Sequence, residues 1–479
     1  MSDFGILAYG AYVPVTRLQR RAIHTLNAWF APGLASLAKG EKAVANWDED
    51  SITMAVEAAR DALENCDRAA VEQLTLASTT LPFADRQNAG VVKEALNLDD
   101  AVGTLDITGS QRAATSALTA ALDGSRQTLV MAAEIATPKP ASAREMTSGD
   151  AAAAILVGTG RPLARLVARH NVSMDFVDHF RATGEAHDYD WEARWIRDEG
   201  FAQILAPAIA TLLDRAGLQG ADIDHFLVPV SVRGVPEMLA KKAGIAATAI
   251  ADTLIAGIGD SGATHPLLML AAALEQAQPK SRILLVSFGQ GCDLLLFEAT
   301  DAIAATRPRL GVSGWLARRQ ESDNYARYLF HRGLFDLDRG MRAEADNKVA
   351  LTALWRNRKA VFGLVGGRCT KTGVVQFPKS DISIGGNSRD IGTQEDYPLA
   401  EVPAKITTWT ADSLTYSPNP PNCYGNIDFE GGGRMTAEFT DFPESDLAVD
   451  AQLRMMFRIH SFDEPRAFRS YFWKAAPAF

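Results

Sequence analysis

Apolar and polar positions follow one another along the first part of the chain in an order that occurs twice. Residues 54–79 carry small apolar residues at helical spacing and then an apolar strand, and residues 207–230 repeat this layout. In each copy a short helix and a further strand lead to a loop of small residues, at 106–111 and at 256–261. The repeated order predicts two copies of one α/β unit.

Each loop is followed by a helix and then by an almost continuous apolar strand, at 128–135 in the first copy and at 282–289 in the second. Such runs are typical of strands that are buried on both faces of an α/β sheet. We therefore place a first half at 1–160 and a second half at 161–305. Ligands of α/β sheets bind beyond the carboxyl ends of the strands, so we expect the chemistry where the two small-residue loops face one another.

The pattern changes after the second half. Residues 306–365 begin with a basic stretch without strand character, expected to be a plain connection, and continue with helical patterns. Residues 366–479 are turn-rich and then alternate apolar with polar positions, as at Met435, Ala437 and Phe439. We expect a connection with a helical lead, followed by a small β-barrel or sandwich.

Composition narrows the possible partners. The 479 residues are 47% apolar and 22% charged, which is typical of a globular protein, and the net charge is −10 without a block of like charges. No nucleic-acid partner is therefore expected. No apolar run reaches the roughly 18 residues that a membrane span needs. Residues 1–10 lack the basic start and cleavage site of a signal peptide, so we expect a cytoplasmic protein and no membrane association.

Four short segments carry a resemblance to a known superfamily. They are the loop DITGSQRAATSAL, the strand GDAAAAILVG, the loop GDSGATHPLLML and the glycine turn SFGQGCDLLLF. With the duplicated unit, they resemble the thiolase superfamily in its 3-hydroxy-3-methylglutaryl-CoA synthase and β-ketoacyl-acyl-carrier-protein synthase III branch. The resemblance implies a duplicated thiolase fold with αβαβα layers, a coenzyme A thioester as substrate, no bound cofactor, and a homodimer built by pairing of the sheets.

The rest of the chain resembles the OB-fold family that accompanies thiolases. The segment RCTKTGVVQFP and the β-rich tail carry this resemblance, which implies a ribbon followed by an OB-fold barrel. The related ribbon holds zinc with two cysteine pairs. This chain has Cys369, Thr372 in place of the second cysteine, and no cysteine in residues 380–388. One thiolate cannot hold a tetrahedral zinc ion, so we expect no metal site.

The family nucleophile is a cysteine that accepts the acyl group from a thioester. If Asp106 is taken as the leading aspartate of the family loop, Gln111 stands in place of that cysteine. A carboxamide cannot carry an acyl group by this route. A shift by one position gives Ser110, which could serve as a nucleophile only with a base nearby.

The other family positions are also replaced. Val230 stands in place of the histidine, Arg233 in place of the asparagine that usually follows it, and Asp260 in place of the asparagine of the second loop. The glutamate of a methylglutaryl synthase falls within residues 78–82, which read STTLP and hold no carboxylate. The ordinary acyl-cysteine route is therefore not available to this chain by itself.

Three residues near these loops remain as catalytic candidates. Asp260 is a carboxylate at a strand end, and His265 follows it by five residues, so the two could transfer protons. Alternatively, His265 is a structural histidine. Cys292 follows the glycine turn, where it is either a reactive thiol or a small buried residue of the core.

Residues 187–201 interleave acidic, basic and aromatic side chains and resemble the stretch that covers the acyl site in the synthase branch. Glu192 and Arg194 are candidates for substrate binding on this ground, and Arg233 is a further candidate for the same role. The same pattern is also typical of a solvated helix face with spaced ion pairs. Both interpretations remain open at the level of sequence.

These inferences predict a protein that binds an acyl-CoA and makes or breaks a carbon–carbon bond next to a thioester. The first hypothesis is the synthase-like and OB-fold subunit of an acyltransferase complex, in which a separately encoded thiolase supplies the cysteine. The second is an aldolase or retro-aldolase that acts on an acyl-CoA without a cysteine. The third is a 3-hydroxy-3-methylglutaryl-CoA synthase, against which the replaced residues count.

Overall fold

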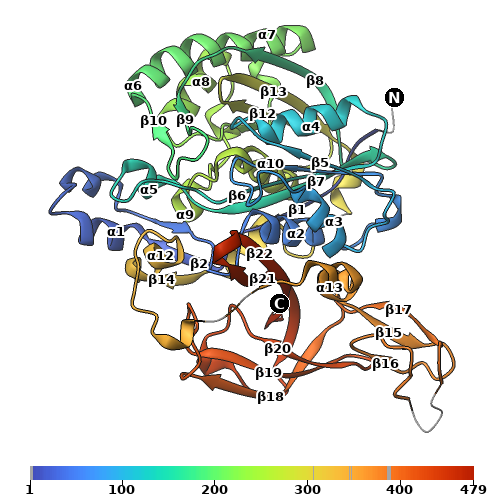
Figure 1. The fold of residues 1–479 in the computed structure, drawn as a ribbon. Helices are drawn as coiled ribbons and strands as arrows, with labels where there is room; N and C mark the ends of the chain where they lie inside the picture. Colours follow the sequence, from blue (N-terminus) through green and yellow to red (C-terminus); the bar gives the residue numbers. More distant parts are fainter. Residues whose placement is uncertain (1–3, 306, 345, 347, 386–389, 479) are drawn as a thin grey trace. The chain divides into compact units, whose positions relative to one another are not determined.

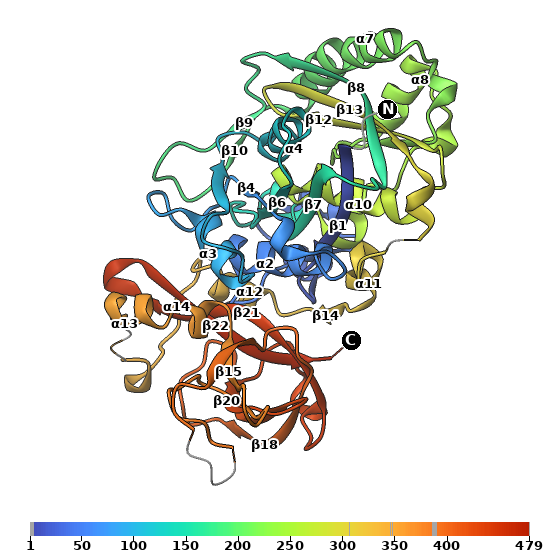
Figure 2. The ribbon, with the colours of Figure 1, turned by 90° about the vertical axis from the view of Figure 1, so that its right-hand side faces the viewer.

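The chain forms two compact units (Figures 1 and 2). The computed structural model describes residues 4–305, 307–344, 346, 348–385 and 390–478. Unit 1 consists of residues 1–46, 50–90 and 99–328. Unit 2 consists of residues 47–49, 91–98 and 329–479. No helix among the described residues is long and apolar enough to cross a membrane.

A mixed sheet of nine strands, counted over the described residues, forms the centre of unit 1. In chain order its strands are β1 (Phe4–Tyr12), β4 (Gln73–Ala77), β5 (Gly103–Ile107), β6 (Thr128–Glu134), β7 (Ala151–Thr159), β8 (Ala164–Ser173), β11 (His225–Leu227), β12 (Arg282–Phe288) and β13 (Gly291–Ala299). Their spatial order is β11-β12-β13-β8-β1-β7-β6-β4-β5. The fold is thus a mixed α/β fold with a large sheet.

The strand order repeats across the middle of this sheet. In the first half β6 runs parallel to β4 and antiparallel to β7, and in the second half β12 runs parallel to β11 and antiparallel to β13. The two halves join where Ile6 of β1 pairs with Ala164 of β8. This symmetry is the structural counterpart of the repeat in the sequence.

Helices of unit 1 accompany this sheet. They are α1 (Arg20–Asn27), α2 (Ser51–Ala62), α3 (Asn88–Ala95, which extends into unit 2), α4 (Ala113–Asp123), α5 (Ala143–Thr147), α6 (Ala193–Trp195), α7 (Ala206–Ala216), α8 (Val235–Ala243), α9 (Ile255–Ile258), α10 (His265–Gln276), α11 (Gly311–Ala317) and α12 (Tyr325–His331, which also extends into unit 2). All residues of α2 are buried, and Asp50 caps its first turn by accepting from the N–H groups of Ile52 and Thr53. Helix α10 is apolar almost all round, as a buried helix must be.

Two small sheets complete unit 1. One contains β14 (Gln320–Ser322), β2 (Thr16–Gln19) and β3 (Glu41–Ala43). The other is a hairpin of β9 (His179–Phe180) and β10 (Tyr189–Asp190), in which His179 lies opposite Asp190 and Phe180 opposite Tyr189. The hairpin matters for the site because its His179 contacts Gln111.

Unit 2 contains the helices α13 (Leu351–Arg356) and α14 (Arg358–Phe362) and two antiparallel sheets. The first sheet contains β15 (Val365–Cys369), β16 (Val375–Gln376) and β17 (Gln394–Pro398). The second contains β18 (Ala404–Asp412), β19 (Asn422–Phe429), β20 (Arg434–Glu438), β21 (Gln452–Asp463) and β22 (Phe468–Pro477), in the order β20-β19-β18-β21-β22. A parallel bridge between Phe439 and Ala475 connects the two ends of this order.

Two stretches differ from the sequence-based expectation. Residues 307–319, expected to be a plain connection, contain α11, because Asp61 accepts hydrogen bonds from the N–H groups of Leu310 and Gly311 and so fixes the start of this helix. Residues 187–201 do not form one helix. They run from β10 through α6 into a π-helical stretch over Ile196–Leu205.

Candidate functional site

Gln111 lies at the meeting point of loops from both halves of unit 1. Strand β5 ends at Ile107 and helix α4 begins at Ala113, so Gln111 sits just before the helix. A Cβ atom added to Gly262 would lie 2.9 Å from Gln111 Oε1, and one added to Gly289 would lie 2.9 Å from Gln111 Cβ. Only glycine allows such close approach, so the carboxamide is enclosed by the second-half loop and the glycine turn.

The hairpin brings an imidazole to this carboxamide. His179 Nε2 lies 3.1 Å from Gln111 Nε2, and His179 Nδ1 lies 3.0 Å from Asp178 Oδ2. The side chains of His179 and Asp178 are only 16% and 15% exposed, so water competes little for these contacts. Asp178, His179 and Gln111 therefore form a connected chain of polar groups that ends at the Gln111 carboxamide.

A buried carboxyl group also lies close to Gly262. Glu134 is the last residue of β6, and it accepts hydrogen bonds from Thr79 N at 3.0 Å and from Thr79 Oγ1 at 2.6 Å. A Cβ atom on Gly262 would lie 3.3 Å from Glu134 Cγ. Burial raises the pKa of Glu134, although the hydrogen bonds from Thr79 and the charge of Arg181 oppose the shift. The site thus contains a carboxyl group that is biased toward its neutral form.

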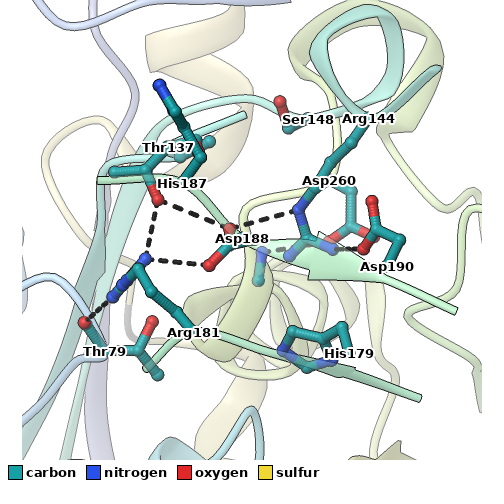
Figure 3. A network of polar contacts seen from close by, with 12 residues as sticks. Thr79, Thr137, Arg144, Ser148, His179, Arg181, His187, Asp188, Asp190 and Asp260 are labelled. Carbon is teal, nitrogen blue, oxygen red and sulfur yellow. Dashed lines mark hydrogen bonds and ion pairs between the residues drawn. The ribbon is translucent and has the colours of Figure 1, made fainter. Parts of the chain in front are cut away.

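Arginine side chains fix the hairpin to the strand ends (Figure 3). Arg181 donates to Thr137 Oγ1 at 2.6 Å, to Asp188 Oδ1 at 2.9 Å and to the carbonyl oxygen of Thr79. On the opposite side of Asp188, Arg144 approaches Oδ2 at 3.2 Å and also pairs with Asp190. These charge-assisted contacts hold both ends of the hairpin in place.

Asp260 takes part in the turn that presents Gly262. Its Oδ1 accepts from Gly262 N at 3.0 Å, and its own N–H donates to the carbonyl oxygen of Thr147 at 2.7 Å. Its negative charge also stabilises the guanidinium of Arg144. The carboxylate therefore shapes the loop beside Gln111, and it faces the arginine network of Figure 3.

His265 lies at the start of α10, where it is fully buried. Its Nδ1 accepts from Ser261 N at 3.1 Å and lies 3.0 Å from Ser261 Oγ, while its Nε2 lies 2.7 Å from the carbonyl oxygen of Thr253. A carbonyl oxygen can only accept, so Nε2 carries the proton. Both ring nitrogens are thus used inside the loop, which favours the structural role over proton transfer with Asp260.

Cys292 is fully buried within the apolar cluster of the second half. Burial, and secondarily the charge of Asp293, raises the pKa of its thiol to about 12. The thiolate is therefore scarce at neutral pH, and the contacts favour a core residue. Ser110 lies beside Gly289, with its hydroxyl 3.4 Å from that carbonyl oxygen and accepting from Arg112 N at 3.1 Å. These contacts give the hydroxyl no basic partner.

The remaining sequence candidates lie outside this cluster of contacts. Val230 packs against the apolar cluster of the second half, and Arg233 is exposed near Arg20, whose pKa its charge lowers after the larger effect of burial. Glu192 is exposed, and the exposed Arg194 lies 3.5 Å from Asp198 one helical turn further on. This pair matches the interpretation of a solvated face.

Sequence reasoning missed His179, which contacts Gln111, and the residues that hold His179 and its hairpin in place. Asp178, His179 and Arg181 follow an irregular segment without a periodic pattern, so nothing in the sequence marked them. Glu134 carried a usable signal, because it is a lone carboxylate at the carboxyl end of an apolar strand.

Cys369 takes part in a set of hydroxyl contacts in unit 2. Cys369 is buried, and its sulfur lies 3.2 Å from Thr393 Oγ1. Hydrogen bonds from Thr372, Thr393 and Ser383 lower the pKa of this thiol to about 6. Among the described residues, no group of three or more His, Cys, Asp or Glu side chains is placed to hold a metal ion.

Comparisons with known proteins agree with this architecture. Residues 213–295 match the model of the 3-oxoacyl-[acyl-carrier-protein] synthase III C-terminal family. The structure of MvaS in complex with 3-hydroxy-3-methylglutaryl coenzyme A is similar with a TM-score of 0.59 at 21% identity, over 70% of this chain and 92% of that one. The synthase III of Aquifex aeolicus VF5 is similar with a TM-score of 0.56 at 18% identity, over 62% of this chain and 99% of that one. The fold is therefore similar to that of these two proteins.

A sequence relative defines the family more closely. The hydroxymethylglutaryl-CoA synthase of Pyrococcus furiosus is 30% identical over 343 residues, which cover 68% of this chain and 95% of the relative. The synthase of Aeropyrum pernix is 28% identical over 343 residues, with 69% of this chain and 95% of the relative covered. The chain belongs to the hydroxymethylglutaryl-CoA synthase family. Roughly a third of its length lies outside the matched part.

Proposed function

We propose that this chain binds an acyl-CoA and serves in making or breaking a carbon–carbon bond next to the thioester, as the synthase-like subunit of a thiolase-type acyltransferase complex. One observation supports the proposal: the carboxamide of Gln111, which the family resemblance puts in place of the cysteine nucleophile, is enclosed by Gly262 and Gly289. A carboxamide accepts no acyl group, and the nearby Cys292 thiol lies in the apolar core. The acyl-cysteine step then belongs to a separately encoded thiolase.

In this proposal, unit 2 contributes to assembly of the complex and not to the reaction itself. Strands β18 to β22 have the order of a five-stranded OB-fold barrel, in which the third and fifth strands close the barrel, as the parallel bridge between Phe439 and Ala475 does here. We infer an OB-fold domain with a ribbon remnant that needs no metal. Strand β5, at the edge of the nine-stranded sheet, is where a second copy would pair to form a homodimer in the cytoplasm.

Mass spectrometry of the purified chain after incubation with acetyl-CoA tests the proposal. No acyl adduct should form, and a stable thioester adduct on any cysteine would overturn it. Co-expression with a thiolase encoded next to this chain should give a complex with acyltransferase activity. That activity should survive the substitutions Asp260→Asn and His265→Ala in this chain as long as the complex stays intact.

A specific observation favours a second candidate function, the cysteine-independent aldolase or retro-aldolase. The site holds two sets of groups that could transfer protons, namely the Asp178–His179 pair beside Gln111 and the buried Glu134 beside Gly262. Turnover of a 3-hydroxyacyl-CoA by the chain alone would favour this candidate. Synthesis of 3-hydroxy-3-methylglutaryl-CoA, the activity for which the relatives are named, ordinarily proceeds through an acyl-cysteine, so we do not extend it to this chain.

A further inference from the structure

The imidazole of His179 is the group that faces the nucleophile position most directly. Its Nε2 lies 3.1 Å from Gln111 Nε2, within hydrogen-bonding distance. The family histidine position holds Val230, which packs against apolar residues and offers no proton acceptor. A base has therefore been lost from one strand end, while an imidazole is present on the β9–β10 hairpin.

The contacts of His179 define which nitrogen is free to accept a proton. The carboxylate of Asp178 lies 3.0 Å from Nδ1 and can only accept, so Nδ1 carries the hydrogen. The neutral ring then presents a lone pair at Nε2, which accepts an N–H of the Gln111 carboxamide. A doubly protonated ring would place two donors face to face at 3.1 Å. The arrangement thus holds an acceptor nitrogen ready at the site.

Two other histidines of unit 1 are engaged differently. His265 uses both ring nitrogens inside its own loop. His187 lies with Nδ1 3.3 Å from the carbonyl oxygen of Thr137, and Figure 3 shows it beside Thr137. His179 therefore differs from both in having a nitrogen that points at the nucleophile position.

The hairpin holds this imidazole in position. His179 pairs with Asp190 across the hairpin, and Arg144 binds Asp190 from α5. Two residues further on, Arg181 is bound to Thr137, Asp188 and the carbonyl oxygen of Thr79. A proton-transfer group works only when its geometry is fixed before the substrate arrives, and these contacts fix it.

We propose that His179, oriented by Asp178, is the base that removes the α-proton of a bound CoA thioester. The Cα–H bond breaks, the proton goes to His179 Nε2, and the electron pair enters an enolate shared by Cα and the thioester oxygen. Gln111, released from His179 when the thioester enters, turns its N–H toward the enolate oxygen and stabilises the charge there. Return of a proton from Nε2 to Cα reverses the step, so no other reactant is needed.

This inference rests on the proposed binding of an acyl-CoA, and it names the residue that activates the substrate. An enolate next to a thioester is the nucleophile from which a new carbon–carbon bond is made. The assignment therefore applies to the chain alone and to a complex in which a thiolase supplies an acyl group. It also explains why a site without a cysteine keeps an oriented carboxylate–imidazole pair.

Deuterium exchange at the α-carbon tests the inference without a second substrate. The full chain is incubated with acetyl-CoA or octanoyl-CoA in D2O, and incorporation at Cα is followed by NMR, while calorimetry measures binding of the same two compounds. The wild type should exchange well above buffer. His179→Ala should lower the rate on the order of 100-fold while binding persists, and added imidazole should restore part of it. Asp178→Asn should also slow the exchange.

A second His179 variant and a control histidine variant make the result of the exchange experiment clear. His179→Gln serves if the alanine variant does not fold, and His170→Ala is the control because His170 lies on β8 against Arg215. Wild-type exchange in both His179 variants would overturn the inference, as would a wild type that binds either thioester but exchanges only at the buffer rate. Failure to bind both compounds would overturn the proposed function and this inference together.

Discussion

The β9–β10 hairpin and the loop that leads into α10 each place a histidine near the candidate site, and the two histidines make opposite kinds of contact. In the hairpin, His179 is bound on one side by Asp178 and leaves its other nitrogen to Gln111. In the loop, His265 is fully buried, with Ser261 and Thr253 occupying both nitrogens.

The difference shows that the role of a histidine near a site depends on what its second ring nitrogen contacts. A ring with both nitrogens bound inside its own loop stabilises a turn, because every contact is satisfied within the fold. A ring with a carboxylate on one nitrogen and a side-chain amide on the other can exchange the amide for a substrate.

Removal of the buried imidazole should have the largest effect on stability. His265→Ala deletes three contacts, leaves Ser261 and Thr253 with unpaired polar groups, and opens a cavity at the start of α10. The free energy of unfolding should fall by about 3 kcal/mol, measured by denaturant titration. His179→Ala should cost less than about 1 kcal/mol, because its ring is partly exposed. Equal losses for the two variants would remove the contrast between loop and hairpin.

Loss of the hairpin anchor should have a smaller and more local effect. Arg181→Met removes the bonds to Thr137, Asp188 and the Thr79 carbonyl oxygen but keeps the apolar stem of the side chain. The protein should lose about 2 kcal/mol and show faster amide hydrogen exchange within residues 179–190. Arg194→Met is the matched control, since Arg194 is 85% exposed on its side chain. Unchanged amide exchange in the hairpin would show that the arginine does not hold it.

More of the fold than of the site could be predicted from the sequence. Long apolar strands and helices with small residues define the repeat, because burial on both faces leaves a strong mark on the sequence. The helix over Gly311–Ala317 left no such mark, since its start depends on Asp61, a residue distant in the chain.

Less of the candidate site could be predicted from the sequence. Gln111 and Asp260 lie on loops next to strand ends, so their position followed from the repeat. The hairpin residues did not, because strands of two residues have no periodicity and are held by long-range contacts such as that of Arg181 with Thr79. Whether His265 is structural or catalytic depends on contacts that only the folded chain defines.

The free energy of unfolding should depend on pH through Glu134, whose buried carboxyl group is biased toward its neutral form. Burial raises its pKa above the ordinary 4.5, so the unfolded chain releases the proton first as pH rises. Above about pH 4.5 the stability contributed by Glu134 is therefore lost, by about 1.4 kcal/mol per pH unit until its folded pKa is reached. Glu134→Gln should remove this dependence, which denaturant titrations of both proteins across pH would show. Parallel pH profiles would mean that the carboxyl group is already charged in the fold.

Substitution of Cys292, which follows the glycine turn, should have the smallest effect on stability. A thiol with a pKa of about 12 that lies in the apolar cluster behaves as a small core residue. Iodoacetamide at neutral pH should therefore leave Cys292 unmodified in the folded protein and label it after denaturation. Mass spectrometry would detect the label. Cys292→Ala should cost about 1 kcal/mol and leave α-proton exchange unchanged. Rapid labelling in the folded state, or lost exchange in the variant, would make this thiol a functional group and weaken the case for His179, because the site would then contain a reactive sulfur after all.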